Sequence, residues 1–313
     1  MKHIHIYLLS IICFLISCSG NQHTQTAEET RKERSFQFPE IPVMLDTPDS
    51  RKAYLCEHYW DNFDFSDTAY IHLPDITEQA IVNFMDLTTQ VSKELSERSI
   101  SNLYQKAAPH SSMLWYFWET MSRYWKDPNS PLRHEEMFIR LCRCVGSIPQ
   151  MEEGIKMRAS FALSLAEKNR VGHPAINFTY TTASGKQGQL HALKAEYILL
   201  FFHNPDCETC RETKDAMKQS AILQAGISSG KLKVLTLYPD EDVELWQAHL
   251  EELSDEWING YDKGQVLTRN ALYDLSAIPS FYLLDKNKKV LLKDADWSQV
   301  TQFLSPFSSS PLG

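Results

Sequence analysis

Residues 196–210 of this 313-residue chain read Glu-Tyr-Ile-Leu-Leu-Phe-Phe-His-Asn-Pro-Asp-Cys-Glu-Thr-Cys, and this stretch decides the fold of the C-terminal half. The apolar run from Tyr197 to Phe202 is typical of a central strand that is covered on both faces. A polar turn then leads into a Cys-x-x-Cys pair, Cys207 and Cys210, after which a helix is predicted to about Leu223. The stretch therefore predicts an α/β sheet with two cysteines where a buried strand meets a helix.

The sequence on both sides of this stretch alternates between strand and helix patterns. We expect a sheet with helices on both faces, because strand–helix–strand units followed by a hairpin and a last helix build that architecture. The predicted strands are residues 176–181, 232–238, 280–285 and 290–293, and the predicted helices are residues 242–253, 266–275 and 297–304.

The spacing and position of the two cysteines point to redox chemistry. At the start of a helix, Cys207 lies beside free backbone N–H groups, and these favour the thiolate that attacks disulfides. Cys210 lies one turn further on, where it can close a ring with Cys207. The alternative is half of a zinc site, which needs two more ligands, and the sequence has no second Cys-x-x-Cys and no His-x-x-x-His. We therefore predict catalytic cysteines, with no metal and no cofactor.

Residues 171–305 resemble the thioredoxin fold, and specifically the periplasmic thiol–disulfide interchange proteins of the TlpA type. The resemblance rests on Gly172-x-Pro174, the Cys-x-x-Cys pair, Trp246 and Ile278-Pro279-Ser280-Phe281. It implies that Pro279 is a cis-proline facing the disulfide and that, with Ile278, it orients a partner chain. The phrases Asn204-Pro205-Asp206-Cys207 and Ser130-Pro131-Leu132-Arg133 also resemble Bacteroidetes-type lipoproteins with a helical domain of unknown function before the thioredoxin-like domain.

The sequence departs from thioredoxin around the cysteines. Thioredoxin has Trp before the first cysteine, Gly-Pro between the two, and a buried Asp six residues upstream; here those places hold Asp206, Glu208-Thr209 and Phe201. Proton transfer at Cys210 then needs another base, for which water, Glu208 and His203 are the candidates. The charges of Asp206 and Glu208 disfavour the Cys207 thiolate, which predicts a couple that leans towards reducing its partners.

The N-terminus has the pattern of a bacterial lipoprotein leader. Lys2 precedes an apolar run over residues 4–16 that is too short to span a bilayer, and Leu15-Ile16-Ser17-Cys18 resembles a lipobox. The resemblance implies a signal peptide over residues 1–17 and lipidation of Cys18, followed by a flexible tether over residues 18–35. Ser19 favours the outer over the inner membrane. The alternative is an ordinary secretory signal with a chance cysteine.

Residues 36–170 predict an all-α domain. Asp75 is expected to cap a helix whose apolar stripe is Ala80, Phe84, Leu87 and Val91. Two further stripes run through Met137, Phe138, Leu141, Cys142 and Val145 and through Ile155, Ala159, Ala162, Leu165 and Ala166, and they make Cys142 a buried structural thiol. Residues 58–67 mix aromatics with aspartates; we interpret them as core aromatics between solvated acids rather than as a sugar-like cleft.

These patterns predict an α plus α/β protein: an all-α domain over residues 36–170, then a thioredoxin-like domain over residues 171–313. The net charge of −9 argues against nucleic-acid partners. The predicted function is that of an envelope-anchored thiol–disulfide oxidoreductase whose partners are periplasmic protein thiols and disulfides, with a membrane electron donor if it acts as a reductant. The alternative is a non-catalytic surface lipoprotein whose helical domain binds protein or glycan. A peroxidase ranks third, because Asn204 stands where such sites have Thr or Ser.

Overall fold

The computed structural model describes residues 34–127 and 130–305. The predicted signal peptide (1–17), the lipidation site Cys18 and nearly all of the predicted tether lie outside these ranges. The described chain from Phe36 onward belongs to one packed unit, with helices first and a sheet after them. The predicted fold class, an all-α region followed by an α/β region, is therefore confirmed. Within the described ranges, none of the helices combines the length and the apolar character that crossing a membrane would require.

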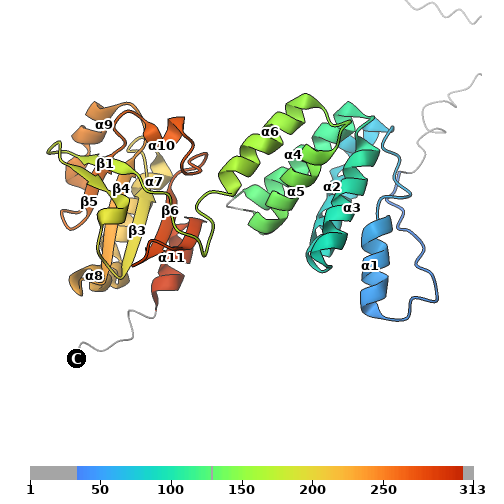
Figure 1. Cartoon of the computed structure of the whole chain (residues 1–313), viewed down its shortest axis with the longest axis horizontal. Helices are drawn as coiled ribbons and strands as arrows, with labels where there is room; N and C mark the ends of the chain where they lie inside the picture. The colour runs from blue at the N-terminus through green and yellow to red at the C-terminus, as the bar shows by residue number, and fades with distance from the viewer. Residues whose placement is uncertain (1–33, 128–129, 306–313) are drawn as a thin grey trace, which may run out of the picture. The chain divides into compact units, whose positions relative to one another are not determined.

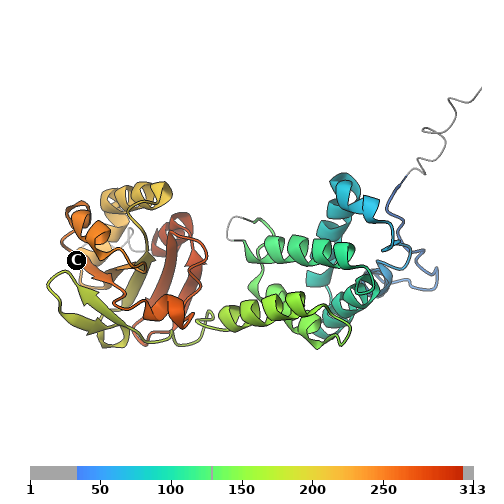
Figure 2. The same ribbon diagram turned by 90° about the horizontal axis from the view of Figure 1, so that it is seen from above.

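The N-terminal region is built from six α-helices and one short 3₁₀ helix in the described chain. Helices α4, α5 and α6 lie side by side (Figures 1 and 2). The predicted apolar stripes on α5 and α6 face the core, and their residues Met137, Cys142 and Ile155 are buried. The bounds are α1 Pro48–His58, η1 Thr68–His72, α2 Pro74–Thr89, α3 Lys93–Ala107, α4 Ser111–Lys126, α5 Glu135–Ser147 and α6 Glu153–Ala166.

The predicted cap at Asp75 is wrong. The helix begins one residue earlier because Pro74 occupies its first turn, so Leu73 takes the capping position without a side-chain hydrogen bond. Asp75 lies inside the first turn, where its charge still favours the helix N-terminus. Val91 lies beyond the end of α2 at Thr89 and packs against the core from outside the helix.

The aromatic segment 58–67 forms part of the helical core. Tyr59, Trp60, Phe63 and Phe65 are all buried, while the acids between the aromatics are exposed. Trp60 meets Phe117 edge to face, with ring centroids 5.0 Å apart. The core interpretation is confirmed, and these rings are not available to line a cleft.

The C-terminal region contains a seven-stranded sheet with the order β2-β1-β5-β4-β3-β6-β7. Strand β3 is central, as its apolar run predicts; it pairs in parallel with β4 and antiparallel with β6. The bounds are β1 Thr179–Thr182, β2 Gln187–Gln189, β3 Tyr197–Phe202, β4 Leu232–Tyr238, β5 Ile258–Tyr261, β6 Ser280–Asp285 and β7 Val290–Ala295.

Successive residues of β3 enter different cores on the two faces of the sheet. Leu200 and Phe202 join the core that includes Leu267 of α10 (Val266–Arg269), whereas Phe201 joins the core with Met217. The second face is covered by the helices labelled α7, α8 and α11 (Figure 1). Their bounds are α7 Glu208–Gln219, α8 Ala221–Ser228 and α11 Trp297–Leu304; α9 is Val243–Ala248, and the 3₁₀ helices are η2 Leu190–Ala192 and η3 Leu250–Glu252.

Two predicted helices differ clearly from the structure, and two of its strands were not predicted. The helix after the cysteines ends at Gln219, and Ser220 caps a separate helix α8 with its hydroxyl group. The predicted helix 266–275 is a single turn that ends at Arg269. Strands β2 and β5 were not predicted, and β5 lies between β1 and β4 in the sheet.

Charged contacts connect the helical region to the sheet region. The side chain of Lys293, within β7, is only 4% exposed, pairs with Glu135 of α5, and donates to the carbonyls of Ala166 and Lys168, each at 2.8 Å. Lys126 of α4 lies 3.3 Å from the Asp274 carboxylate. These contacts place the end of α4 against the loop that precedes β6.

Candidate active site

The two cysteines occupy the first turn of α7 and differ in exposure. Cys207 is the N-cap of this helix, and its sulfur accepts a hydrogen bond from the backbone N–H of Cys210 at 3.2 Å. Cys207 is half-buried, whereas Cys210 is 2% exposed. Both are free thiols. The turn therefore presents Cys207 to a partner and keeps Cys210 beneath it.

The predicted substrate-orienting residues lie beside the accessible thiol. Ile278 and Pro279 end the loop before β6, and the peptide bond between them is cis. The Cys207 thiol donates to the Ile278 carbonyl at 3.8 Å. Strand β6 pairs with β3, which leads into the cysteine turn, so the sheet register brings together residues that are 71 positions apart.

Burial controls the chemistry of Cys210. Desolvation raises the pKa of the Cys210 thiol to about 12, and its hydrogen bond with Cys207 adds to this shift.

Side-chain hydrogen bonds fix the loop between β3 and α7 at both ends. Arg211 donates to the Pro205 carbonyl at 2.8 Å, and Asn204 donates to Asp240 at 2.7 Å. Cys210 is thus a protonated thiol at neutral pH, held in a fixed turn.

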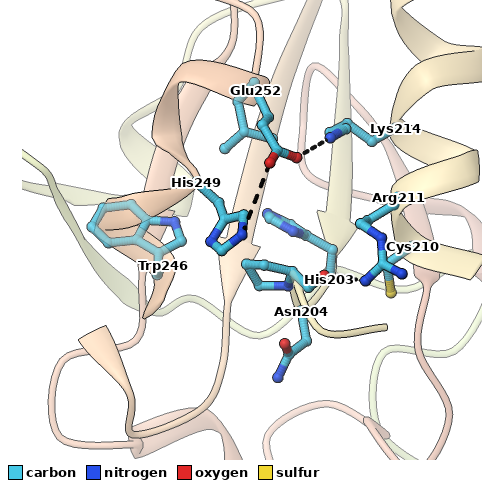
Figure 3. Close-up of a pocket in the computed structure, with 10 residues that line it drawn as sticks. His203, Asn204, Cys210, Arg211, Lys214, Trp246, His249 and Glu252 are labelled. Carbon is cyan, nitrogen blue, oxygen red and sulfur yellow. Dashed lines mark hydrogen bonds and ion pairs between the residues drawn. The ribbon is translucent and has the colours of Figure 1, made fainter. Parts of the chain in front are cut away.

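A small cavity of about 10 Å³ lies behind Cys210, and Figure 3 shows the side chains around it. This volume is enough for about one water molecule. His203 and Trp246 line the cavity, and His203 Nε2 and Trp246 Nε1 are buried without a hydrogen-bond partner among the described residues. Such groups are usually satisfied by ordered water, so the cavity fits a single buried water beside Cys210.

Of the candidate bases predicted for Cys210, His203 lines this cavity, whereas Glu208 is exposed and does not line it. The imidazole of His203 stacks on Phe201 with ring centroids 4.9 Å apart. Burial, and next the charge of Lys214, lower the pKa of His203 to about 4, so the ring is neutral at pH 7. A neutral ring with so low a pKa is a weak proton acceptor, so the proton of Cys210 has to leave by exchange with the solvent.

Three charged or titratable residues of this cavity, Lys214, His249 and Glu252, were not predicted from the sequence. The Lys214 side chain is 10% exposed and forms an ion pair with Glu252, which follows α9 in the short helix η3. His249 lies 3.9 Å from the same carboxylate (Figure 3). Lys214 follows Cys207 and Cys210 at the spacing i, i+3, i+7, which places all three on one helix face. That spacing was the available signal.

The cysteines of the helical region belong to its own hydrophobic core. Cys56, Cys142 and Cys144 are buried, and burial raises the pKa of each thiol, that of Cys142 to about 12. Cys56 donates to Ser99 Oγ at 3.4 Å. Across the described residues, no group of three or more His, Cys, Asp or Glu side chains is arranged to hold a metal ion.

The geometry of sheet, helix and cysteine turn agrees with comparisons to known proteins. A crystal structure of a thioredoxin-like protein from Bacteroides caccae is 44% identical, with a TM-score of 0.74, and the match covers 87% of this chain and 99% of that one. The chain belongs to the thioredoxin-like proteins. This thioredoxin-like chain also matches, over residues 17–169, the family model described as "Domain of unknown function (DUF5106)". The predicted resemblance to thioredoxin-like proteins with a preceding domain of unknown function is confirmed.

Further relatives of this thioredoxin-like protein match less than half of its length. The C-terminal domain of an uncharacterized Bacteroides fragilis protein is 50% identical, covers 44% of this chain and 98% of that one, and has a TM-score of 0.43. The "Thiol-disulfide oxidoreductase ResA" of Bacillus anthracis is 26% identical over 125 residues, which are 40% of this chain and 69% of the relative.

Proposed function

We propose that this protein catalyses thiol–disulfide exchange with protein partners through Cys207 and Cys210. The observation that carries the proposal is that the accessible Cys207 sulfur, at the helix N-cap, lies one turn before the buried Cys210 thiol. The backbone N–H of Cys210 donates a hydrogen bond to the Cys207 sulfur at 3.2 Å. The name of the Bacillus relatives, thiol-disulfide oxidoreductase, supports the same reaction class.

The proposed reaction has two steps. The Cys207 thiolate attacks one sulfur of a partner disulfide, forms a mixed disulfide, and releases the other partner sulfur as a thiolate that takes a proton from water. Cys210 then loses its proton to water and attacks Cys207 Sγ, which releases the second partner thiolate. The partner is reduced by two electrons, and the protein is left with a Cys207–Cys210 disulfide. In the reverse direction the same steps oxidise a partner dithiol.

Trapping the mixed disulfide tests this proposal. In the Cys210→Ala variant the second step is blocked, so partner proteins should accumulate on Cys207 and be released by a reductant. The Cys207→Ala variant should trap none, and Cys142→Ala, which alters a buried thiol of the helical region, should behave as the parent protein. If the Cys210→Ala variant traps nothing in its native host and the parent protein fails to reduce insulin, the proposed function is wrong.

We further propose that lipid on Cys18 anchors the protein in the cell envelope, in the outer rather than the inner membrane. The thioredoxin-like region would then lie outside the cytoplasm. The lipobox-like Leu15-Ile16-Ser17-Cys18 supports this location. A protein that reduces disulfides there would draw electrons from a donor in the membrane. Metabolic labelling with a fatty acid should mark the parent protein, and the Cys18→Ala variant should stay unlabelled. A parent protein without label would refute the anchor.

A further inference from the structure

The helical region contributes one wall of a groove that reaches Thr209, the residue between the two cysteines in the sequence. The groove has a volume of about 710 Å³. One wall belongs to the sheet region and includes Thr209, Thr213, Ile278, Pro279 and Trp297. The opposite wall comes from the helical region, with Ser122, Arg123 and Lys126 of α4 and Arg133 before α5. A volume of this size is typical of sites that enclose most of a ligand. It is larger than the space that a single cysteine side chain of a partner would fill.

We propose that this groove binds the polypeptide segment flanking the partner's cysteine, so that α4 helps to select the partner. The inference rests on the proposed disulfide exchange and assigns a role to the helical region within it.

The first argument is continuity with the reactive sulfur. Thr209 lies between the two cysteines in the sequence and lines the groove, as does Ile278, whose carbonyl accepts from the Cys207 thiol at 3.8 Å. A partner in mixed disulfide with Cys207 must leave its neighbouring residues against the surface that surrounds this sulfur. Because an extended chain advances about 3.3 Å per residue, a few residues are enough to extend from the sulfur into the groove.

The second argument is the chemistry of the walls. Arg123 lies 2.7 Å from Glu78, and Lys126 and Arg133 lie 3.3 Å and 3.6 Å from Asp274 and Asp294, so these cations are already paired. The groove thus offers no uncompensated positive charge to an anion such as a phosphate. Apolar surface from Ile278, Pro279 and Trp297 lies next to these pairs, as it does in sites for uncharged side chains.

The third argument is an unused hydrogen-bonding group. Ser280 lines the groove, is 5% exposed, and its hydroxyl has no hydrogen-bond partner among the described residues. A buried hydroxyl without a partner costs free energy. A polypeptide backbone carries an N–H and a C=O at almost every residue and can supply the missing partner. Apolar surface, paired charges and an unsatisfied hydroxyl together fit a peptide segment better than an anion.

Site-specific crosslinking tests where the flanking segment lies. In the full chain with Cys210→Ala, a photoreactive benzoylphenylalanine replaces Arg123, and Cys207 is coupled to a biotinylated peptide with one central cysteine. Illumination should attach the peptide to α4. The control places the same group at Arg143, an exposed residue of α5 outside the groove, and should give no attachment. A coupled peptide that crosslinks at neither position, or equally at both, overturns the inference alone. A Cys207 that cannot be coupled overturns the proposed function as well.

A kinetic measurement tests the groove without a crosslinker. Thr213→Trp places bulk in the groove from α7, and Glu212→Trp places the same bulk on the same helix outside it. We expect Thr213→Trp to lower the ratio of the rate with a peptide disulfide to the rate with glutathione disulfide by about tenfold. Glu212→Trp should leave this ratio as in the parent protein. Equal ratios in both variants would overturn the inference.

Discussion

The backbone N–H of Cys210 donates a hydrogen bond to the sulfur of Cys207 across 3.2 Å, so a buried thiol and an accessible one share a single helical turn. The two cysteines have the same side chain but differ in burial. The loop after β3 leaves Cys207 half-buried, whereas the first turn of α7 places Cys210 in the interior. Their reactivities should therefore separate in experiments that leave the fold intact.

Alkylation should distinguish the two thiols. In the folded, reduced protein we expect iodoacetamide to modify Cys207 at least about tenfold faster than Cys210, because the reagent needs an accessible thiolate. Mass spectrometry of the digested protein at increasing times measures both rates. In denaturant the two rates should converge, and equal rates in the folded protein would contradict the burial of Cys210.

The second step of exchange should depend steeply on pH. Since the pKa of Cys210 is raised to about 12, its thiolate fraction increases about tenfold for each pH unit well below that value. With glutathione attached to Cys207, release of glutathione should accelerate about tenfold per unit between about pH 7 and pH 9. Stopped-flow measurement of the released thiol gives the profile. A plateau below about pH 8 would mean that a neighbouring base removes the proton.

His203 should make the fold sensitive to mild acid. Its pKa falls from the ordinary value of 6.5 to about 4 in the folded protein, so between these values the unfolded chain binds a proton that the folded chain does not. The free energy of unfolding should therefore decrease as pH falls from 6.5 towards 4, by up to about 3 kcal/mol from this residue. Urea unfolding at several pH values measures it.

The matched variant for this titration is His203→Phe, which keeps a ring to stack on Phe201 but cannot bind a proton. Its free energy of unfolding should change less between pH 6.5 and pH 4 than that of the parent protein. Other acids, including Asp294 with its pKa raised to about 6, titrate in both proteins and cancel in the difference. Identical pH profiles would show that His203 is hydrated in the folded state.

The two partners of the Lys214–Glu252 ion pair should respond unequally to mutation. Glu252→Gln leaves the ammonium, 10% exposed, with only Asp215 at 3.7 Å, and we expect a loss of about 1–2 kcal/mol in the free energy of unfolding. Lys214→Met removes the buried charge itself and should cost less, because Glu252, 43% exposed, remains hydrated. Urea denaturation compares the two variants. The opposite order would mean that Lys214 reaches solvent.

Gly188 should tolerate no side chain, because a Cβ there would lie 2.4 Å from the Tyr180 ring, its partner across the β1–β2 ladder. We expect Gly188→Ala to lower the free energy of unfolding by about 1–3 kcal/mol. The control is Gly146→Ala in α5, where a Cβ has no neighbour within 4 Å, and it should be neutral or stabilising by up to about 1 kcal/mol. Thermal unfolding of both variants checks the contrast.

The C-terminal fold was predictable where the pattern was strong. Strands β4 and β6 and helix α11 have the predicted bounds, because continuous apolar runs and an Asp296 cap mark them clearly in the sequence. Strand β5 has no such mark. Its sequence Ile-Asn-Gly-Tyr contains two weak strand formers, and it is a strand because Gly260 fits against Tyr180 and β4 supplies hydrogen bonds.

Of the candidate site, the sequence predicted the two cysteines and the cis peptide bond before Pro279, but not the charged residues around them. Lys214 and Glu252 are 38 positions apart, and each resembles the charged residues of an exposed helix face. Only the packing of η3 against α7 brings them together as an ion pair in which Lys214 is buried. The groove between α4 and the loop before β6 has no sequence signal, since tertiary contacts such as Lys126 with Asp274 create it.

The burial of the three thiols in the helical region has a consequence for the redox pair. Cys56, Cys142 and Cys144 are buried as protonated thiols, so they neither attack the Cys207–Cys210 disulfide nor compete for a mixed disulfide on Cys207. Among the described cysteines, oxidising equivalents that enter at Cys207 can leave only through Cys210 or a partner. Burial in the helical core thus keeps these three thiols out of disulfide exchange, so that, among the described cysteines, each exchange event that involves Cys207 pairs it with Cys210 or with a second molecule.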